Sequence, residues 1–188
     1  MSNRKVIAQV AITVFIPFLI VQSAYTQVKR AKYPLTEFDN YGCMAKGRVQ
    51  DCRGSVTQQI LTDGKDAIPI LISQLTETAV TKSQIADYWS GTRSGDVAFV
   101  VLNDLFTDTD LHTFEMPGVP DWTAVQKGCH RAAEACWDEY LRKHGRMSVR
   151  QAWQRAWNVH KGQIHWDAKA QCFRVSARLR PSARNLSS

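Results

Sequence analysis

The chain has 188 residues and a formal net charge of +7, with 44% hydrophobic, 22% charged and 10% aromatic residues. This composition excludes a disordered, collagen-like or low-complexity chain and is typical of a globular fold. A chain of this length can bury about two-thirds of its unfolded surface, so we expect one compact domain.

The N-terminal segment has the pattern of a signal peptide, which we assign to residues 1–26. Arg4 and Lys5 precede an almost wholly apolar stretch at residues 6–21. This stretch is shorter than the ~20 apolar residues of an ordinary transmembrane helix, and small residues before Gln27 suit cleavage. We therefore expect export to the periplasm or secretion. A retained membrane anchor and a buried core helix are the alternatives.

Residues 27–34 show no periodicity and are predicted to be a basic linker. They precede a single helical domain, which we place at residues 35–177. Its first helix is expected to begin at Ser55 and to stop at Gly64. A second helix should follow Asp66, because this residue can cap a run in which apolar residues recur at helical spacing.

A third helix is predicted at residues 96–106, where the sequence DVAFVVLNDLF is apolar on nearly all sides. Ser94 or Gly95 is expected to cap it. A helix that is apolar all round belongs in the centre of the core. The following residues 108–120 are polar and contain prolines, so we expect a surface loop there.

Two more helices are predicted in the second half of the chain. The first is expected to be capped by Asp121 and stopped by Gly145, and the second to be capped by Ser148 and closed by Gly162. Because only a few residues join them, we expect these helices to form an antiparallel hairpin.

The C-terminal part is predicted to end the domain with a small β-hairpin, because apolar residues alternate over residues 164–175. Residues 178–188 are expected to form a disordered tail. The predicted fold class is therefore mainly α, a compact helical domain of about five helices with a small C-terminal β-hairpin.

Residues 54–106 contain the segment GKDAIPILISQL, which lies between a short predicted helix and GDVAFVVLNDLF. This order resembles the antiparallel helix pairs of HEAT-type repeats, in which Ala-Ile-Pro begins the inner helix. The sequence has no second copy at a fixed period, so we do not expect a solenoid. The resemblance implies a scaffold geometry and assigns no functional residues.

Five cysteines in an exported chain predict disulfides, because the compartment beyond the membrane is oxidising. Cys43 and Cys52 flank a Gly-containing turn and are expected to pair. Cys129 and Cys136 fall about 10 Å apart on one predicted helix, which is too far for a disulfide. One of them is therefore expected to pair with Cys172, with a slight preference for Cys129. The cysteine that remains is expected to be a buried small side chain, although an intermolecular bridge is an alternative.

The motif DCRGSV at residues 51–56, followed by GDVAF at residues 95–99 and by His112, resembles the order of motifs in NlpC-type cell-wall cysteine peptidases. The resemblance implies a Cys52 nucleophile at a helix N-terminus, a strand at GDVAF, a His112 base and a peptidoglycan substrate. Arg53 stands where the family has Ser, and the His-Val-Gly-Ile strand that normally presents the base is missing.

Metal and cofactor motifs are incomplete in this sequence. His130 and Glu134 fall four residues apart on a predicted helix, but two ligands do not make a metal site. The sequence has no HExxH motif, no phosphate-binding loop and no dinucleotide fingerprint. We therefore expect no metal and no cofactor.

Charge is divided unevenly along the chain. Residues 27–140 contain 11 basic and 16 acidic residues, whereas residues 141–188 contain 11 basic residues and a single acid, Asp167. Such a basic segment can bind an anionic partner, pair with the acidic half of the same fold, or form solvated surface. The predicted contact residues follow the helix end and the next helix start: Arg142, Lys143, Arg146 and Arg150.

The sequence as a whole predicts an exported, non-enzymatic helical domain that acts by binding in the cell envelope or outside the cell. The expected partner is a protein or an anionic envelope polymer. Nucleic acid is not expected, and membrane contact is expected only if the N-terminal helix is retained. The alternative is a cell-wall cysteine peptidase or amidase that uses Cys52 and His112.

Overall fold

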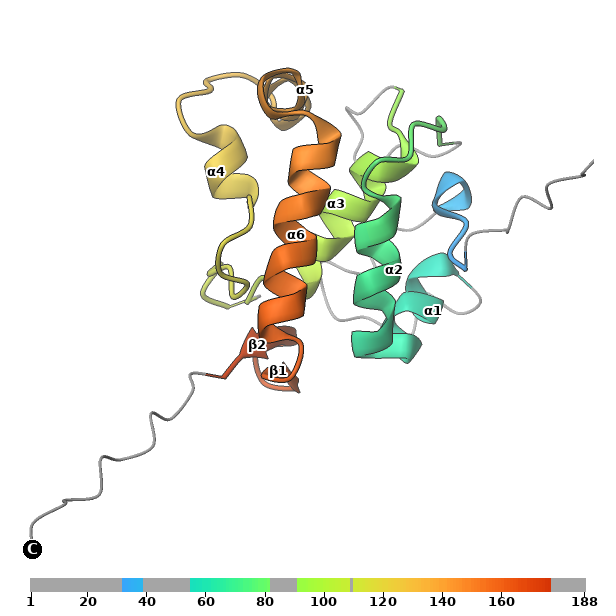
Figure 1. Cartoon of the computed structure of the whole chain (residues 1–188), viewed down its shortest axis with the longest axis vertical. Coiled ribbons are helices and arrows are strands. Elements are labelled where there is room, and N and C mark those ends of the chain that lie inside the picture. The colour runs from blue at the N-terminus through green and yellow to red at the C-terminus, as the bar shows by residue number, and fades with distance from the viewer. Residues whose placement is uncertain (1–31, 39–54, 82–90, 109, 177–188) are drawn as a thin grey trace, which may run out of the picture.

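The computed structural model describes residues 32–38, 55–81, 91–108 and 110–176. The signal peptide, most of the linker and the C-terminal tail that the sequence predicts lie outside these residues. Figure 1 shows how the helices and the hairpin are arranged. In chain order the elements are η1 (Leu35–Glu37), α1 (Val56–Asp63), η4 (Gly64–Asp66), α2 (Ala67–Gln74), α3 (Ser94–Leu105), α4 (Trp122–Gln126), α5 (Ala133–His144), α6 (Arg146–His160), β1 (Ile164–Asp167) and β2 (Cys172–Val175).

The architecture is mainly α with a C-terminal antiparallel hairpin, which confirms the predicted fold class. No helix within the described ranges is long and apolar enough to cross a membrane. Within the HEAT-like segment, α2 and α3 make the largest contact between two helices in the described chain. That pairing positions the core, and the family resemblance itself stays a prediction.

The first two helices follow the local signals in the sequence. Helix α1 starts at the predicted place: Ser55 is its N-cap, and its Oγ accepts a hydrogen bond from the backbone N–H of Gln58 at 3.0 Å. Gly64 follows the last residue of α1 with a positive φ of 55°, which favours glycine. Asp66 does precede α2, but its side chain makes no capping hydrogen bond, because the 3-10 turn of η4 leads directly into the helix.

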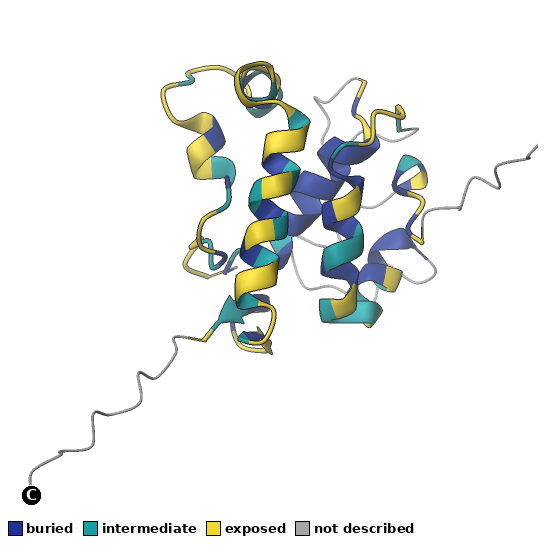
Figure 2. Cartoon of the chain, in the orientation of Figure 1, coloured by how far each residue is buried: buried dark blue, intermediate teal, exposed yellow. Residues whose placement is uncertain are grey.

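Helix α3 is the centre of the domain, as its apolar sequence predicts. Eleven of its twelve residues are buried, and Figure 2 shows it enclosed between α2 and α6. The N-cap is Arg93 and not Ser94 or Gly95, because the Asp96 carboxylate accepts the Arg93 backbone N–H at 2.8 Å. A Cβ on Gly95 would lie 2.6 Å from the backbone oxygen of Leu75, so glycine permits this close approach to the end of α2.

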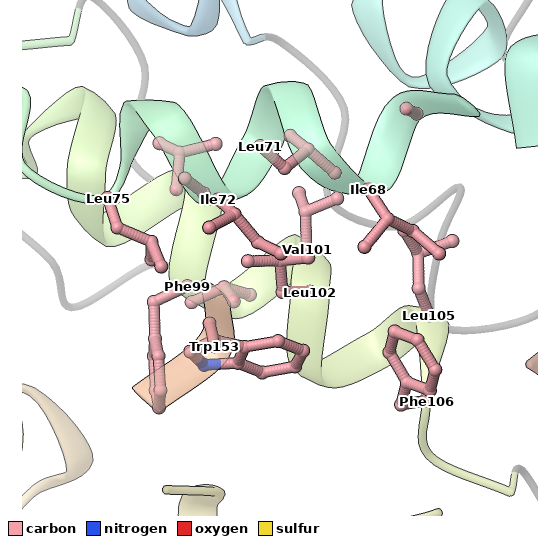
Figure 3. Close-up of a cluster of buried hydrophobic side chains, with 14 of the residues drawn as sticks. Ile68, Leu71, Ile72, Leu75, Phe99, Val101, Leu102, Leu105, Phe106 and Trp153 are labelled. Atoms are coloured by element: carbon pink, nitrogen blue, oxygen red, sulfur yellow. The ribbon is translucent and has the colours of Figure 1, made fainter. Parts of the chain in front are cut away.

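The core forms where α2, α3 and α6 meet (Figure 3). Helix α2 presents a stripe of aliphatic side chains to α3, and Trp153 of α6 reaches into the same cluster. Burial of such side chains contributes roughly 1.5–3 kcal/mol each before entropy is subtracted. Buried members that Figure 3 labels are Ile68, Leu71, Ile72, Leu75, Phe99, Val101, Leu102, Leu105, Phe106 and Trp153.

The predicted loop at residues 108–120 is less exposed than expected. Asp108 and Met116 are buried, and the Phe114 ring lies edge-on to the Trp153 indole with 6.0 Å between centroids. The segment therefore covers one side of α6, and the prediction of a surface loop is wrong for these residues.

The long helix predicted at residues 121–144 is two helices. Asp121 caps α4 as expected, since its side chain accepts the backbone N–H of Ala124 at 2.8 Å. The chain then leaves the helix at Gly128, which has a φ of 76°. Helix α5 begins only at Ala133.

This break overturns the predicted disulfide pattern. Cys129 lies in the turn before α5 and is bonded to Cys136 on that helix, with 5.8 Å between their Cα atoms. The predicted bond from Cys129 or Cys136 to Cys172 is wrong. That prediction excluded a Cys129–Cys136 bond because it assumed that both residues lie on one continuous helix. Cys172 is a free, buried thiol whose pKa is raised by burial. The predicted Cys43–Cys52 pair lies outside the described residues.

We expect peptide mapping without reduction to recover a fragment that links Cys129 to Cys136. Cys172 should react with a thiol reagent only after denaturation, because its side chain is fully buried. Closing a loop of this length should stabilise the domain by about 2.5 kcal/mol, which urea unfolding of the Cys129→Ser and Cys136→Ser double variant measures. A fragment that links Cys172 to either partner would contradict the structure.

Helices α5 and α6 are joined by Gly145 alone, which has a φ of 77°. They do not form the predicted antiparallel hairpin: Figure 1 looks almost straight down the axis of α5, whereas α6 runs from top to bottom in the picture. The predicted cap at Ser148 is also wrong. Helix α6 starts at Arg146, because the glycine turn leads directly into its first residue.

The C-terminal hairpin is confirmed. Strands β1 and β2 pair antiparallel, with Ile164 opposite Val175 and Trp166 opposite Phe173. Because side chains alternate along a strand, these four residues share one face of the hairpin.

Candidate binding site between α3, α5 and α6

The four predicted contact residues occupy different environments. Arg142 and Lys143 are exposed in the last turn of α5. Arg150 is partly buried one turn into α6. Arg146 is not the exposed residue that the prediction assumed, because its side chain retains only 17% of its accessible surface.

Arg146 is buried because it pairs with Asp96 of α3. Its Nη2 lies 2.5 Å from Oδ1 of Asp96, and the indole Nε1 of Trp137 donates to the same oxygen at 2.7 Å. The other carboxylate oxygen, Oδ2, accepts the Arg93 backbone N–H. The Asp96 carboxylate, only 9% exposed, thus ties together the start of α3, the middle of α5 and the start of α6.

A cavity of about 360 Å³ opens beside this network. Its wall carries three guanidinium groups, three carboxylates and the Trp137 ring, and these come from three separate stretches of the chain. The lining residues are Gly91, Thr92, Arg93, Asp96, Glu134, Trp137, Asp138, Leu141, Arg142 and Arg146. Of the predicted contact residues, the structure therefore brings Arg142 and Arg146 together here.

Sequence reasoning missed Arg93, whose side chain is exposed and lines the same cavity. It lies in the acidic half of the chain, about 50 residues before Arg142. Its place just before a strongly apolar helix was the available signal, and that signal indicates a helix start and not a binding role.

Two carboxylates share the cavity with these cations. Glu134, Asp138 and Arg142 follow each other at four-residue intervals on α5, so they fall on one side of that helix. Asp96 is paired with Arg146. The charged side chains that remain to face a ligand are the positive Arg93 and Arg142 and the negative Glu134 and Asp138. Such a cavity can hold a partner that carries both an anionic and a cationic group.

Comparison with protein-family models, curated proteins and solved structures gives no match.

His130 and Glu134, which do not by themselves make a metal site, were predicted to lie four residues apart on one helix. The structure places His130 in the turn before α5, whereas Glu134 is on the helix and lines the cavity. Within the described ranges, no group of three or more His, Cys, Asp or Glu side chains is placed to hold a metal ion.

The peptidase resemblance requires a strand at residues 95–99, and the structure has the first turns of α3 there. His112 is exposed in the loop after α3, with a φ of 52°. Cys52 lies outside the described residues, so the structure does not show the two together. The peptidase stays an untested alternative.

A second basic residue of the C-terminal part is also engaged by an acid. Arg174 on β2 bonds to the buried carboxylate of Asp108, and its Nε lies 3.2 Å from Oδ2 of Asp167. The pKa of Asp108 is held below its usual range, chiefly by the backbone N–H of Leu111 and also by Arg174. Part of the charge asymmetry is thus neutralised inside the fold, as one of the sequence hypotheses states.

Proposed function

We propose that this protein is an exported, non-enzymatic binding domain that attaches to a cell-wall polymer through the cavity between α3, α5 and α6. The observation that carries the proposal is the convergence of Arg93 and Arg142 on one cavity that the carboxylates of Glu134 and Asp138 also line. The pattern of residues 1–26 supports export.

Both signs of charge in one cavity favour a polymer with carboxylates and ammonium groups close together, as in the peptide stems of peptidoglycan. Arg93 and Arg142 would bind a carboxylate of the polymer through charge-assisted hydrogen bonds. Glu134 and Asp138 would accept an ammonium group beside it. Arg146 contributes by holding Asp96 and the cavity wall in place.

The test is co-sedimentation of the full mature chain with insoluble peptidoglycan. Replacing both Arg93 and Arg142 with Gln should weaken binding roughly tenfold at low salt, since two charge-assisted contacts are lost. Binding of the parent should also fall as salt is added. Replacing Glu134 with Gln and Asp138 with Asn should weaken binding too, because the ammonium partner is lost.

The matched control replaces Arg155 and Lys161 with Gln. Both are exposed, Arg155 in the second half of α6 and Lys161 directly after its end, and both lie outside the cavity, so the variant loses the same charge elsewhere. Its binding should stay within about twofold of the parent. Equal losses in the two double variants would show that binding follows net charge, and the cavity proposal would then be wrong.

A further inference from the structure

A second cavity, of about 480 Å³, lies between the C-terminal hairpin and the turn after α1. It differs from the charged cavity because most of its wall is apolar. Volumes of this size fall within the range of about 300–1,000 Å³ that small-molecule sites occupy. Its lining residues are Leu61, Gly64, Lys65, Leu105, His165, Trp166 and Phe173.

The hairpin register explains the apolar wall. Trp166 and Phe173 are direct cross-strand partners on one face, and their rings meet edge to face with centroids 5.1 Å apart. Phe173 is buried, yet Trp166 keeps 45% of its surface exposed. A large indole at the edge of an apolar cavity offers contact area that the fold itself does not use.

The opposite wall comes from the turn that links α1 to α2. Gly64 has no side chain to fill the space, and a Cβ there would lie 3.9 Å from the Phe173 ring. Lys65 follows it and anchors the hairpin, because its Nζ donates to the backbone oxygen of Ile164 at 3.0 Å. An ammonium group has three N–H donors, so Lys65 keeps donors for a ligand.

His165 also lines this cavity, but its side chain is directed differently from that of Trp166. Strand alternation places its side chain on the other face from Trp166, and its Nδ1 lies 3.1 Å from the Ser176 hydroxyl. The cavity therefore combines an aromatic and aliphatic wall with the ammonium group of Lys65.

We propose that this cavity binds an anionic amphiphile, with its apolar chain against Leu61, Trp166 and Phe173 and its head group at Lys65. Charge complementarity selects an anionic head, and the apolar wall selects a hydrocarbon chain. The proposal does not depend on the cell-wall proposal, since the two cavities share no residue.

The experiment titrates the full mature chain with decanoate and measures the heat of binding by calorimetry. We expect saturable binding with one site. Trp166→Ala should weaken decanoate binding roughly tenfold, because the main apolar contact is lost. Leu61→Phe should weaken it by a similar factor, since the larger ring fills part of the cavity.

The charge is tested with Lys65→Gln, using decanoate against the neutral alcohol decanol. The variant should bind decanoate about fivefold to tenfold more weakly and bind decanol within about twofold of the parent. Lys161→Gln and Val159→Ala, which change exposed residues at the end of α6 and directly after it, outside the cavity, should change neither affinity. Absence of saturable decanoate binding, or an affinity that Trp166→Ala and Leu61→Phe both leave unchanged, would overturn the proposal.

Discussion

Replacing Asp96 with Ala is expected to lower the free energy of unfolding by about 3–5 kcal/mol, because it breaks a buried ion pair. The carboxylate accepts hydrogen bonds from Arg146, Trp137 and the Arg93 backbone. Its removal would leave the Arg146 guanidinium largely buried without its carboxylate. Urea unfolding followed by circular dichroism measures the loss.

A double-mutant cycle separates this ion pair from general damage to the fold. Arg146→Gln alone should cost about 3 kcal/mol, since it leaves Asp96 buried without its cation. The double variant Asp96→Ala with Arg146→Gln should lose much less unfolding free energy than the sum of the two single losses, because the two side chains interact directly. Arg142→Gln, exposed four residues earlier, is the control and should change stability by less than about 0.5 kcal/mol. Additive losses would contradict the coupling.

The ion pair changes how the basic end of the chain must be tested. A variant that replaces Arg142, Lys143, Arg146 and Arg150 together would lose stability through Arg146, and its binding could not be interpreted. Arg146 and Arg174 both pair with acids from the earlier part of the chain. The positive charge available to a partner is therefore smaller than the count in residues 141–188 indicates.

Local signals predicted most helix positions because helix starts and ends are determined by neighbouring residues. Ser55 and Asp121 cap the helices at which they were placed, and Gly64 and Gly145 follow helix ends. The apolar run of α3 correctly indicated a central helix, since a sequence without a polar face must be enclosed by other elements.

Predictions that needed the path of the chain between elements were wrong. Apolar spacing continued across Gly128, so the turn that brings Cys129 to Cys136 was hidden within an apparent helix. The burial of Arg146 depends on Asp96, which is 50 residues away in the sequence. A single sequence carries no local signal for such a contact, and for the same reason Arg93 was missed.

Both cavities are products of tertiary structure. The charged one joins residues just before α3 to two helices near the C-terminus, and the apolar one joins the turn after α1 to the hairpin. Sequence patterns predicted most of the elements that line the cavities. They did not predict which faces of these elements pack next to one another. The candidate site was therefore predicted only in part, through Arg142 and its neighbours.

Trp153→Ala should be the most destabilising single change in the core, with an expected loss of about 3–5 kcal/mol in the free energy of unfolding. Trp153 is fully buried on α6, and its ring contacts those of Phe106 and Phe114, with centroids 5.8 and 6.0 Å away. Alanine would leave a large cavity where α6 meets α3, which the surrounding helices can fill only partly.

Trp153→Phe separates the contribution of side-chain volume to stability from that of the indole N–H. The indole Nε1 is buried and has no hydrogen-bond partner among the described residues, which costs about 1–3 kcal/mol. Phenylalanine removes that N–H and keeps most of the ring, so its loss in unfolding free energy should be at least about 2 kcal/mol smaller than that of Trp153→Ala. Urea unfolding of both variants measures the difference. If phenylalanine costs as much as alanine, the indole N–H contributes a stabilising hydrogen bond and α6 is held by that polar contact as well as by packing.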